Sequence, residues 1–448
     1  MWCERSIIVR AIKSKDGAMQ HRLMILGSME EFTALVQLAH KKGIYTIVCD
    51  GYKNGPAKKL ADKAIHLDVR ATQEIATLCQ QEKVDGIITS FSDLLAECLV
   101  DIAFRTKLKC YCMPKKMAYL RNKTKMKEMF DQLNIPTPPS VELAPDFLAG
   151  TLDTIGFPCV IKPLNGYGSR GVLVAQNEAE VREHFTETCS YSSFGSVLAE
   201  PYNAGYEFNM MSWILNGQAH VLSIADREKS QEIEGAVPHV SRIVYPSRMM
   251  CEVYEPARQI IQKVANFTEI ETGPLSMQFF YSPEKGLQVC EVAGRFFGYE
   301  HELLHYAGGL CIEELLLDYV YDEKAMCRRV EKHDPWLKGR SAGLYFHGYE
   351  GEIEDVSAMR QAFAMKIEGA EVTESMLYYN DGDAVSHKVG AKPYVARCYI
   401  TGRNYYTLDK LTGQLYKAAS VKGRAEREML YRNQLPTYTK NDRREEKE

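Results

Sequence analysis

The sequence predicts an α/β protein with three parts: a parallel strand–helix domain, a mixed region rich in hairpins, and a β-rich C-terminal unit. Apolar runs alternate with helical spacing over residues 22–104, which is typical of a parallel sheet covered by helices. A glycine-rich loop between two short apolar runs at 158–174 predicts a hairpin. Short apolar runs separated by turn residues follow residue 337. The length of 448 residues agrees with about three domain-sized units.

The first domain begins with a predicted strand at Arg22–Leu26 (RLMIL), followed by a helix at 30–42 and a strand at 45–49. Apolar residues in that helix recur at a spacing of three to four. The turn after the first strand lacks the pattern GxGxxG, so it does not predict dinucleotide binding. The alternation continues with a strand at 63–67, a helix at 72–81, a strand at 84–89 and a helix at 94–104.

Ligands usually bind at loops that follow the carboxyl ends of parallel strands. In this domain those loops are Asp50–Asn54 and Ser90–Asp93. Ser90, Ser92 and Asp93 are candidates for a ligand contact. Ser and Asp are also favoured at the start of a helix, and helix capping is the interpretation that residue type alone favours.

The functional predictions for this chain start from the stretch Pro158–Gly171 (PCVIKPLNGYGSRG). A strand at 159–161 leads into Lys162, three glycines and a second strand at 172–174. Glycine lets the backbone approach an anion, and lysine adds a positive charge, so the hairpin could cover phosphates. No GK[ST] follows, which excludes a Walker A loop, and a strand rather than a helix follows the glycines, which excludes the dinucleotide fingerprint. An ordinary surface hairpin remains the alternative.

A pair of basic helices at 115–133 precedes this stretch and ends at a proline cluster, which predicts a domain boundary. The sequence also predicts a polar loop over 227–242 and a disordered tail over 441–448. Three more helices are predicted at 178–186, 251–267 and 308–321. The remaining predicted strands lie at 196–200, 206–215, 219–225, 275–281, 287–292, 341–347, 352–356, 363–366 and 394–401.

The composition is that of an ordinary globular protein, with 45% hydrophobic and 25% charged residues. A net charge of −4 argues against a nucleic-acid partner. There is no apolar run long enough to span a membrane and no signal-peptide pattern near the N-terminus, so no membrane partner is expected. The 13 cysteines include no CxxC pair. This usage predicts reduced thiols and a cytoplasmic location.

Chemically useful side chains follow one another along the middle of the chain. Paired lysines can neutralise a polyphosphate, a carboxylate can accept both ribose hydroxyls, and oxygens on adjacent strands suit a hard cation. An arginine beside them can stabilise charge on an acyl phosphate. Each residue alone fits an ordinary structural position, so the signal is their order. They are Lys123 in RNKTKMKEMFDQLNIPTP, Lys162, Glu200 in EPYN, Glu207, Gln278 and Glu291 on two strands predicted to pair, and Arg295.

This order resembles the ATP-grasp superfamily, in particular its carboxylate–amine ligases. The chain is similar in this respect to L-amino-acid ligases, to biotin carboxylase and to the ATP-grasp units of the carbamoyl-phosphate synthetase large chain. The resemblance extends over 1–402 and is most specific over 122–309. It implies a pre-ATP-grasp domain (1–114), ATP-grasp subdomain A (115–195), subdomain B with the metal site (196–336), a β-rich C-terminal lid (337–440) and a disordered tail (441–448).

The resemblance also implies roles for individual residues. Lys123 and Lys162 would contact the nucleotide, and Lys162 together with Arg295 would serve catalysis. Gln278 and Glu291 would bind Mg²⁺, with Mn²⁺ as an alternative. The other implied ATP contacts are Gly166, Gly168, Ser169 and Gly171 in the flexible loop, Glu200, Pro201, Tyr202 and Asn203 at the adenine hinge, and Glu207 at the ribose.

Two positions depart from the pattern of the superfamily. Gln278 is an amide where most members have a carboxylate, although the carbamoyl-phosphate synthetase units share this feature. Ala293 stands where many members have an asparagine. These departures leave the number of bound metal ions open.

The resemblance implies a ligase that activates a carboxylate as an acyl phosphate and joins it to an amine, releasing ADP and phosphate. Its partners would be small molecules, and a homodimer is a candidate assembly. Two alternatives remain: an enzyme that uses bicarbonate, similar to biotin carboxylase, and a nucleotide-binding regulator without catalysis. The loop at 228–241 would border the second substrate. For His239, His301 and His305, substrate contacts or packing are favoured over a zinc site.

Overall fold

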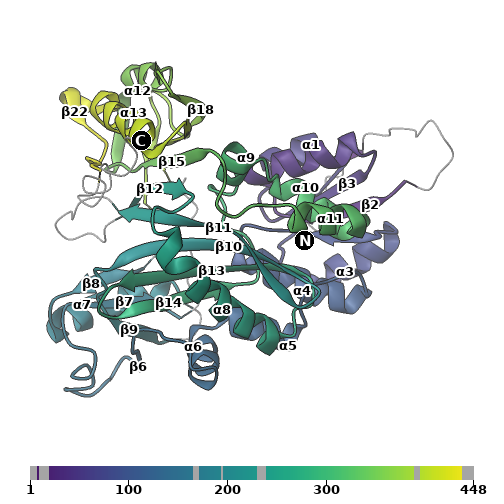
Figure 1. The fold of residues 1–448 in the computed structure, drawn as a ribbon, viewed down its shortest axis with the longest axis horizontal. Coiled ribbons are helices and arrows are strands. Elements are labelled where there is room, and N and C mark those ends of the chain that lie inside the picture. Colours follow the sequence, from purple (N-terminus) through teal and green to yellow (C-terminus); the bar gives the residue numbers. More distant parts are fainter. Residues whose placement is uncertain are drawn as a thin grey trace, which may run out of the picture.

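The computed structural model describes residues 8–9, 20–164, 171–192, 195–229, 239–387 and 394–435. Part of the predicted polar loop, at 230–238, and the predicted tail at 441–448 lie outside these ranges. Figure 1 shows three parts: an N-terminal unit on the right, a sheet-and-helix lobe at the lower left, and a C-terminal unit at the upper left, which a large central sheet connects.

The N-terminal unit is built on a parallel sheet, as predicted. Within the described residues this sheet has five strands in the order β1-β4-β3-β2-β5, and only the short edge strand β1 (Ile8–Val9) runs antiparallel. Continuous apolar runs form its central strands because helices cover both faces. The parallel strands are β2 (Arg22–Leu26), β3 (Tyr45–Asp50), β4 (Lys63–His66) and β5 (Gly86–Ile88).

The order of these strands places a topological switch point between β2 and β5. The chain leaves β2 toward β3 on one side, while β5 lies on the other side. The loops after β2 and β5 therefore open at the same edge, where ligands usually bind. The helices of this unit are η1 (Glu30–Phe32), α1 (Thr33–Lys41), α2 (Pro56–Leu60), α3 (Thr72–Gln81) and α4 (Asp93–Thr106).

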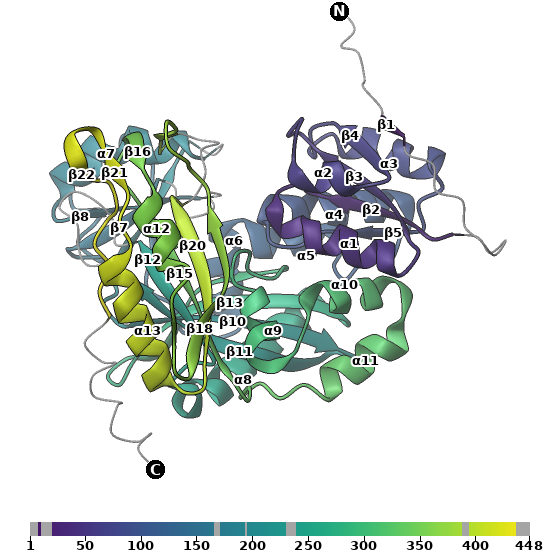
Figure 2. The same cartoon turned by 90° about the horizontal axis from the view of Figure 1, so that it is seen from above.

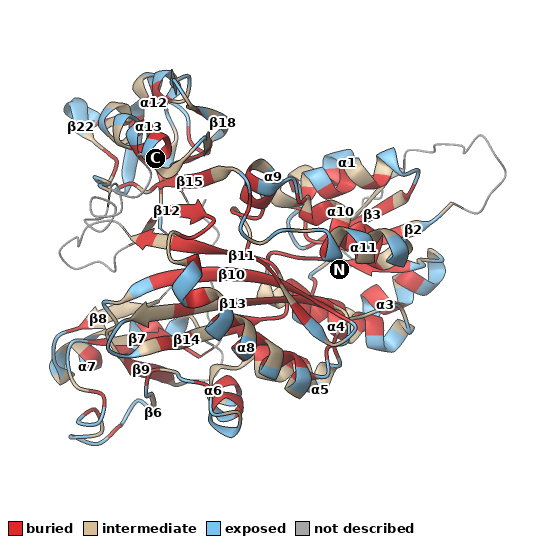
Figure 3. Ribbon diagram, viewed as in Figure 1, coloured by how far each residue is buried: buried red, intermediate tan, exposed pale blue. Residues whose placement is uncertain are grey.

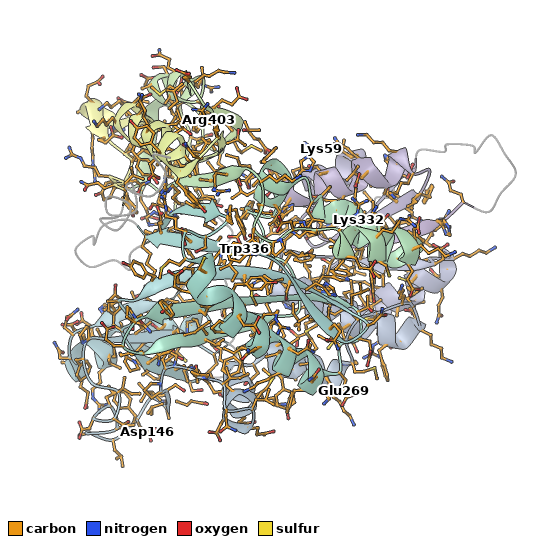
Figure 4. All side chains as sticks on the ribbon, in the orientation of Figure 1. Lys59, Asp146, Glu269, Lys332, Trp336 and Arg403 are labelled. Carbon is orange, nitrogen blue, oxygen red and sulfur yellow. The ribbon has the colours of Figure 1, made fainter. Side chains whose placement is uncertain are left out.

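The lower lobe contains a small antiparallel sheet that carries the predicted hairpin. Two helices, α5 (Pro114–Arg121) and α6 (Lys123–Gln132), lead into it. In the part of the chain that the structure describes, its four strands have the order β6-β9-β7-β8, and α7 (Glu178–Ser190) packs against β7 and β8. Asp146 in Figure 4 marks the end of this lobe farthest from the N-terminal unit. The strands are β6 (Val141–Leu143), β7 (Cys159–Pro163), β8 (Leu173–Ala175) and β9 (Val197–Pro201).

A large antiparallel sheet forms the centre of the molecule. Among the described residues it has nine strands, in the order β14-β13-β10-β11-β12-β15-β20-β18-β17. Its central strand β10 is almost entirely buried, and most residues of β11 and β13 are buried too (Figure 3). Strands β15, β17, β18 and β20 of the C-terminal unit extend this sheet, whereas β16, β19, β21 and β22 form a separate four-stranded sheet among the described residues. The strands are β10 (Tyr206–Leu215), β11 (Gln218–Lys229), β12 (Val240–Tyr245), β13 (Gly273–Ser282), β14 (Gly286–Ala293), β15 (Arg340–Phe346), β17 (Lys366–Ile367), β18 (Ala370–Leu377) and β20 (Ala396–Gly402).

The remaining elements cover this sheet or complete the C-terminal unit. Helix α10 packs against α1 and β5, so the N-terminal unit is joined to the centre (Figure 2). Trp336, labelled in Figure 4, lies in the segment that leads from α11 to β15. The helices are α8 (Met250–Thr268), α9 (Glu302–Gly308), α10 (Ile312–Tyr321), α11 (Glu323–Glu331), α12 (Ser357–Ala362) and α13 (Tyr405–Ala418); η2 (Arg424–Glu426) and the strands β16 (Gly351–Asp355), β19 (Ala384–Val385), β21 (Lys422–Gly423) and β22 (Arg427–Glu428) complete the chain.

Three predicted elements were wrong. The polar stretch at 227–242 includes the end of β11 and the first half of β12, because its charged side chains find partners across the sheet. The helix at 308–321 begins at Ile312, since α9 ends at Gly308 and Gly309 takes a left-handed φ of +77°. The strand at 363–366 is the end of a helical turn rather than a strand. Helices α9, α11 and α13 were not predicted.

Three further observations bear on the predictions: the pairing of β9, the state of the cysteines and the search for a membrane-spanning helix. Strand β9 pairs with β6 and β7, so the small sheet crosses the subdomain boundary predicted at 195/196. All cysteines in the described ranges are free thiols. No helix in the described ranges is both long and apolar enough to cross a membrane.

Candidate active site

One face of the central sheet carries the predicted metal ligands. Gln278 of β13 is the direct cross-strand partner of Glu291 of β14, and Asn209 of β10 is its partner on the other side. Cross-strand partners project from the same face of a sheet. The structure therefore brings the two predicted metal ligands together, with an amide and a carboxylate oxygen as hard donors for a cation.

The predicted nucleotide lysine Lys162 lies in a buried charge cluster. Its Nζ contacts Oε2 of Glu200 at 2.5 Å, and Nζ of Lys127 contacts Oε1 of the same carboxylate at 2.7 Å. Burial alone would raise the pKa of Glu200, but the two ammonium groups hold that pKa below its usual value. Two lysines against one carboxylate leave a net positive charge, which suits a phosphate.

Lys127 was missed by the sequence analysis, which chose Lys123 on the same helix. The two residues are four apart on α6, so they lie on the same side of that helix. Lys123 lies near Asp93 and helps to lower the pKa of its carboxyl group. The two lysines of α6 thus face different acidic partners, Glu200 and Asp93.

The predicted ribose carboxylate Glu207 is also buried, with a side chain that is 3% exposed. It is in contact with Arg227 and Gln278, and Nζ of Lys229 lies 2.6 Å from its Oε2. Burial would raise the pKa of Glu207, but Arg227 and Lys229 hold it below its usual value. Arg227 and Lys229 were not predicted, because their end of β11 was assigned to a loop.

Arg295, the predicted catalytic arginine, forms a bidentate ion pair with Asp93. Nε lies 2.9 Å from Oδ1 and Nη2 lies 2.7 Å from Oδ2. Burial would raise the pKa of Asp93, but Arg295 holds it below its usual value. Asp93 therefore serves as a partner for Arg295 across a domain junction. The predicted helix capping was wrong, because no side chain among the described residues caps the start of α4.

The predicted adenine hinge continues from β9. Pro201 pairs with Cys159 in the small sheet, and the backbone N–H of Tyr202 donates to the carbonyl of Pro158 at 2.9 Å. Nδ2 of Asn203 donates to Oε1 of Gln288 on β14 at 3.1 Å. The hinge segment thus spans the two sheets.

Only one end of the predicted phosphate loop is described. Gly166, Gly168 and Ser169 lie outside the described residues. Gly171 has φ +68°, and a Cβ there would come within 2.5 Å of the Tyr191 ring. Both the positive φ and the close approach of the Tyr191 ring therefore require a glycine at position 171.

The same sheet face continues beyond the metal ligands into a second cluster. Tyr245 OH and Nδ2 of Asn209 donate to the two oxygens of Glu300, each at 2.8 Å. Glu300 is 2% exposed, and burial raises the pKa of its carboxyl group to about 7. Tyr345 and Arg397 are cross-strand partners on β15 and β20.

The histidines have structural partners. Nε2 of His301 lies 2.8 Å from Oε1 of Glu313, and its ring stacks on Phe91 at 4.0 Å. Burial would lower the pKa of His301, but Glu302 and Glu313 raise it to about 9. His239 stacks on His347 with ring centroids 4.6 Å apart. Within the described residues no group of three or more His, Cys, Asp or Glu side chains could hold a metal ion.

Comparison with known proteins identifies one region directly. Residues 155–301 match the family model described as the ATP-grasp domain. The chain is similar to the formate-dependent phosphoribosylglycinamide formyltransferase of Wigglesworthia glossinidia brevipalpis, with 25% identity over 59% of this chain and 67% of that protein. It is also similar to the protein of that name from Haemophilus ducreyi, with 22% identity over 54% of this chain and 61% of that protein. The chain thus spans about two thirds or less of the length of these relatives.

Solved structures share the fold over most of the chain. The L-amino acid ligase of Bacillus licheniformis has a TM-score of 0.74 and 17% identity, covering 90% of this chain and 99% of that chain. The N5-carboxyaminoimidazole ribonucleotide synthetase of Thermotoga maritima has a TM-score of 0.67 and 17% identity, covering 90% and 100%. The resemblance to the ATP-grasp superfamily and the α/β fold class are therefore confirmed.

Proposed function

We propose that this chain, with its ATP-grasp domain, is an ADP-forming ligase that activates a carboxylate as an acyl phosphate and joins it to an amine. The observation that carries the proposal is the single sheet face on which Glu207, Gln278 and Glu291 lie. Lys162, which with Lys127 contacts Glu200, and Arg295 both lie within electrostatic reach of Glu291. The L-amino acid ligase named above shares this fold over nearly its whole length.

The residues present fit Mg²⁺-ATP. Lys127 and Lys162 supply more positive charge than Glu200 neutralises, which suits the phosphates. The amide of Gln278 uses its nitrogen to contact Glu207, which leaves its oxygen beside Glu291 for a metal ion. A bound Mg²⁺ would neutralise charge on the transferred phosphate. Mn²⁺ has the same preference for oxygen donors.

The roles of the other residues follow from the same geometry. The catalytic task in such a transfer is positioning and charge stabilisation, so no nucleophilic side chain is required. Arg295 can hold the carboxylate substrate or its acyl phosphate once that group competes with Asp93. Glu207 can accept hydrogen bonds from ribose hydroxyls. We assign the adenine to the hinge at 200–203 and the phosphates to Lys162 and the loop at 166–171.

A bicarbonate-dependent reaction is the second candidate. A biotin carboxylase domain from Hydrogenobacter thermophilus, described in complex with ADP and bicarbonate, shares the fold with a TM-score of 0.67 and 15% identity, covering 92% of each chain. The same nucleotide site would serve this chemistry. We propose a cytoplasmic location for either enzyme, and a homodimer as the assembly to be tested.

The test is ADP release from Mg²⁺-ATP with a matrix of amino acids, small carboxylates, amines and bicarbonate. ADP release that needs both a carboxylate and an amine would support the ligase and identify its substrates. Release with bicarbonate alone would support the second candidate. Tight ATP binding without turnover across the matrix would indicate a nucleotide-binding regulator instead.

A further inference from the structure

Two carboxylates in or near the second cluster of the sheet face, the half-buried Glu31 and the buried Glu300, form no ion pair within 4 Å among the described residues. Their cationic neighbours act from farther away: His301 and Arg397 on Glu31, and Arg227 and Arg295 on Glu300. Glu31 follows β2 in η1, and Glu300 follows β14. Glu31 accepts a hydrogen bond from the hydroxyl of Tyr299. Its other oxygen, Oε2, is buried with no hydrogen-bond partner. Elsewhere in this site every buried carboxylate has a basic partner: Glu200, Glu207 and Asp93.

The segment that carries Glu300 packs against the topological switch point of the N-terminal sheet, where Glu31 lies. A Cβ on Gly298 would lie 3.1 Å from Cβ of Phe91, in the loop after β5, and 3.5 Å from Oε1 of Glu31, after β2. The segment beginning at Gly298 therefore lies directly against both loops. Tyr299 has φ +57° and Phe91 has φ +69°, so two non-glycine residues adopt the left-handed region at this junction.

Tyr394 of the C-terminal unit lies within electrostatic reach of both carboxylates. Burial raises the pKa of its phenol to about 12, and Glu300 and Glu31 add to the increase. Its ring contacts that of Tyr299 edge-on, with centroids 5.9 Å apart. The N-terminal unit, the central sheet and the C-terminal unit thus all contribute to one place.

A second, independent feature indicates a ligand there. Asn209 is 4% exposed, and its Oδ1 is buried without a hydrogen-bond partner. The nitrogen of the same amide donates to Glu300, so this oxygen lies beside that carboxylate. An unpaired buried acceptor costs free energy, so such atoms normally have a donor. Among the residues that the structure describes, neither Oδ1 of Asn209 nor Oε2 of Glu31 has such a donor.

We propose that the acceptor substrate binds here as a cationic amine, with its ammonium group held by Glu31 and with Glu300 and Asn209 beside it. An ammonium group offers three donors and no acceptor, which matches a site made of unpartnered acceptors. The inference rests on the proposed ligase function and names the chemical class of its acceptor.

The charge state of the site agrees with this assignment. Burial raises the pKa of the Glu31 carboxyl group to about 7, as it does for Glu300. A bound cation would favour the ionised carboxylates and so recover part of the cost of their burial.

The experiment measures probe binding to the full chain by calorimetry, with Mg²⁺ and a non-hydrolysable ATP analogue present. The amine probes are L-alanine, L-lysine and ethanolamine. The matched probes without an amine are propionate and ethylene glycol, and ribose 5-phosphate represents phosphate-bearing acceptors. We expect at least one amine to bind more tightly than its counterpart and than ribose 5-phosphate. The proposal is overturned by preferential binding of ribose 5-phosphate, or by no binding of any amine.

Two variants test whether Glu31 holds the amine. Glu31→Gln should weaken binding of the best amine by about tenfold or more, because it removes a charge-assisted contact. Glu354→Gln, on an exposed strand residue, should change it by less than about twofold. Unchanged amine binding in a folded Glu31→Gln protein overturns the proposal; if that variant does not fold, the preference of the wild-type protein among the probes decides it. Binding of the ATP analogue is measured in the same samples, so loss of the nucleotide site is distinguished from loss of the acceptor site.

Discussion

Asp93 and Arg295 lie 202 residues apart in the sequence and form a bidentate ion pair, with contacts of 2.9 and 2.7 Å. Asp93 begins α4 of the N-terminal unit, and Arg295 follows β14 of the central sheet. The pair therefore joins the two units at the edge of the candidate active site. It also neutralises the arginine assigned to phosphoryl transfer, so an anionic substrate must compete with Asp93 for it.

Removing one partner of this pair should destabilise the protein. Asp93→Ala leaves Arg295 without its carboxylate, and the two side chains are only 18% and 12% exposed. The full cost of breaking a buried pair is about 3–5 kcal/mol, and partial exposure reduces it to about 2 kcal/mol. Urea unfolding measures the change. Glu255→Ala, which breaks an exposed pair with Arg258, should leave the midpoint nearly unchanged, and equal effects of the two variants would refute the structural role of Asp93.

Lys162→Ala should weaken ATP binding. The lysine would lose a charge-assisted contact worth about 1.5–3 kcal/mol, which corresponds to a roughly tenfold to hundredfold rise in Kd. Calorimetric titration with ATP measures the effect, and the exposed Lys125 provides a matched Lys→Ala control. An unchanged affinity for ATP in Lys162→Ala would contradict the assignment of the phosphates to Lys162 and the loop at 166–171.

The same titration distinguishes the contributions of Lys123 and Lys127 on α6 to ATP binding. Lys127→Ala removes one of the two ammonium groups at Glu200 and should weaken ATP binding by a similar factor of about ten. Lys123→Ala, if the superfamily pattern holds, should weaken it as well. A loss of affinity in Lys123→Ala alone would show that Lys127 only neutralises Glu200.

Local patterns predicted helix α3 from the spacing of its buried face, and strands β2 and β10 from apolar content, since both strands are buried on both faces. Strand β2, helix α3 and strand β10 begin and end where the sequence predicted. The order of the lysines, Glu207, Gln278 and Glu291 also predicted one nucleotide site, and the structure brings the last three residues onto one sheet face. The spacing of Gln278 and Glu291 around a turn is what makes them cross-strand partners.

Partners supplied from a distant part of the chain were not predictable in this way. Arg227 and Lys229 looked like loop residues because their partner Glu207 lies on the neighbouring strand, which a local pattern does not contain. The same holds for Asp93, whose partner is 202 residues away. Helical spacing could have identified Lys127, since residues four apart share a face.

Glu291→Ala should abolish ADP release while leaving the protein folded. The variant loses the charged member of the predicted metal pair, and Gln278 alone offers one neutral oxygen. Glu284→Ala, in the exposed turn between β13 and β14, is the matched control and should keep full activity. Circular dichroism reports the fold of both variants. Activity equal to wild type in Glu291→Ala would show that the metal site lies elsewhere.

The buried Glu300 predicts how stability depends on pH. Burial raises its pKa from 4.5 to about 7 in the folded protein, although Tyr245 and Asn209 oppose that increase. Between these values the carboxyl group is protonated when folded and ionised when unfolded, so the folded state binds more protons. Its contribution to the free energy of unfolding is therefore largest below pH 4.5, decreases as the pH rises toward 7, and is constant above that.

Glu300→Gln removes this contribution, since the new amide does not titrate. The free energy of unfolding of the variant minus that of wild type should increase by about 3 kcal/mol as the pH rises from 4.5 to 8. Each unit by which folding shifts the pKa corresponds to about 1.4 kcal/mol. Urea unfolding across this range, with Glu31 intact in both proteins, measures the difference. Glu354→Gln should follow the wild-type curve at every pH. Parallel curves for Glu300→Gln and wild type would mean that Glu300 is ionised in the folded protein at neutral pH, with a cationic partner already beside it.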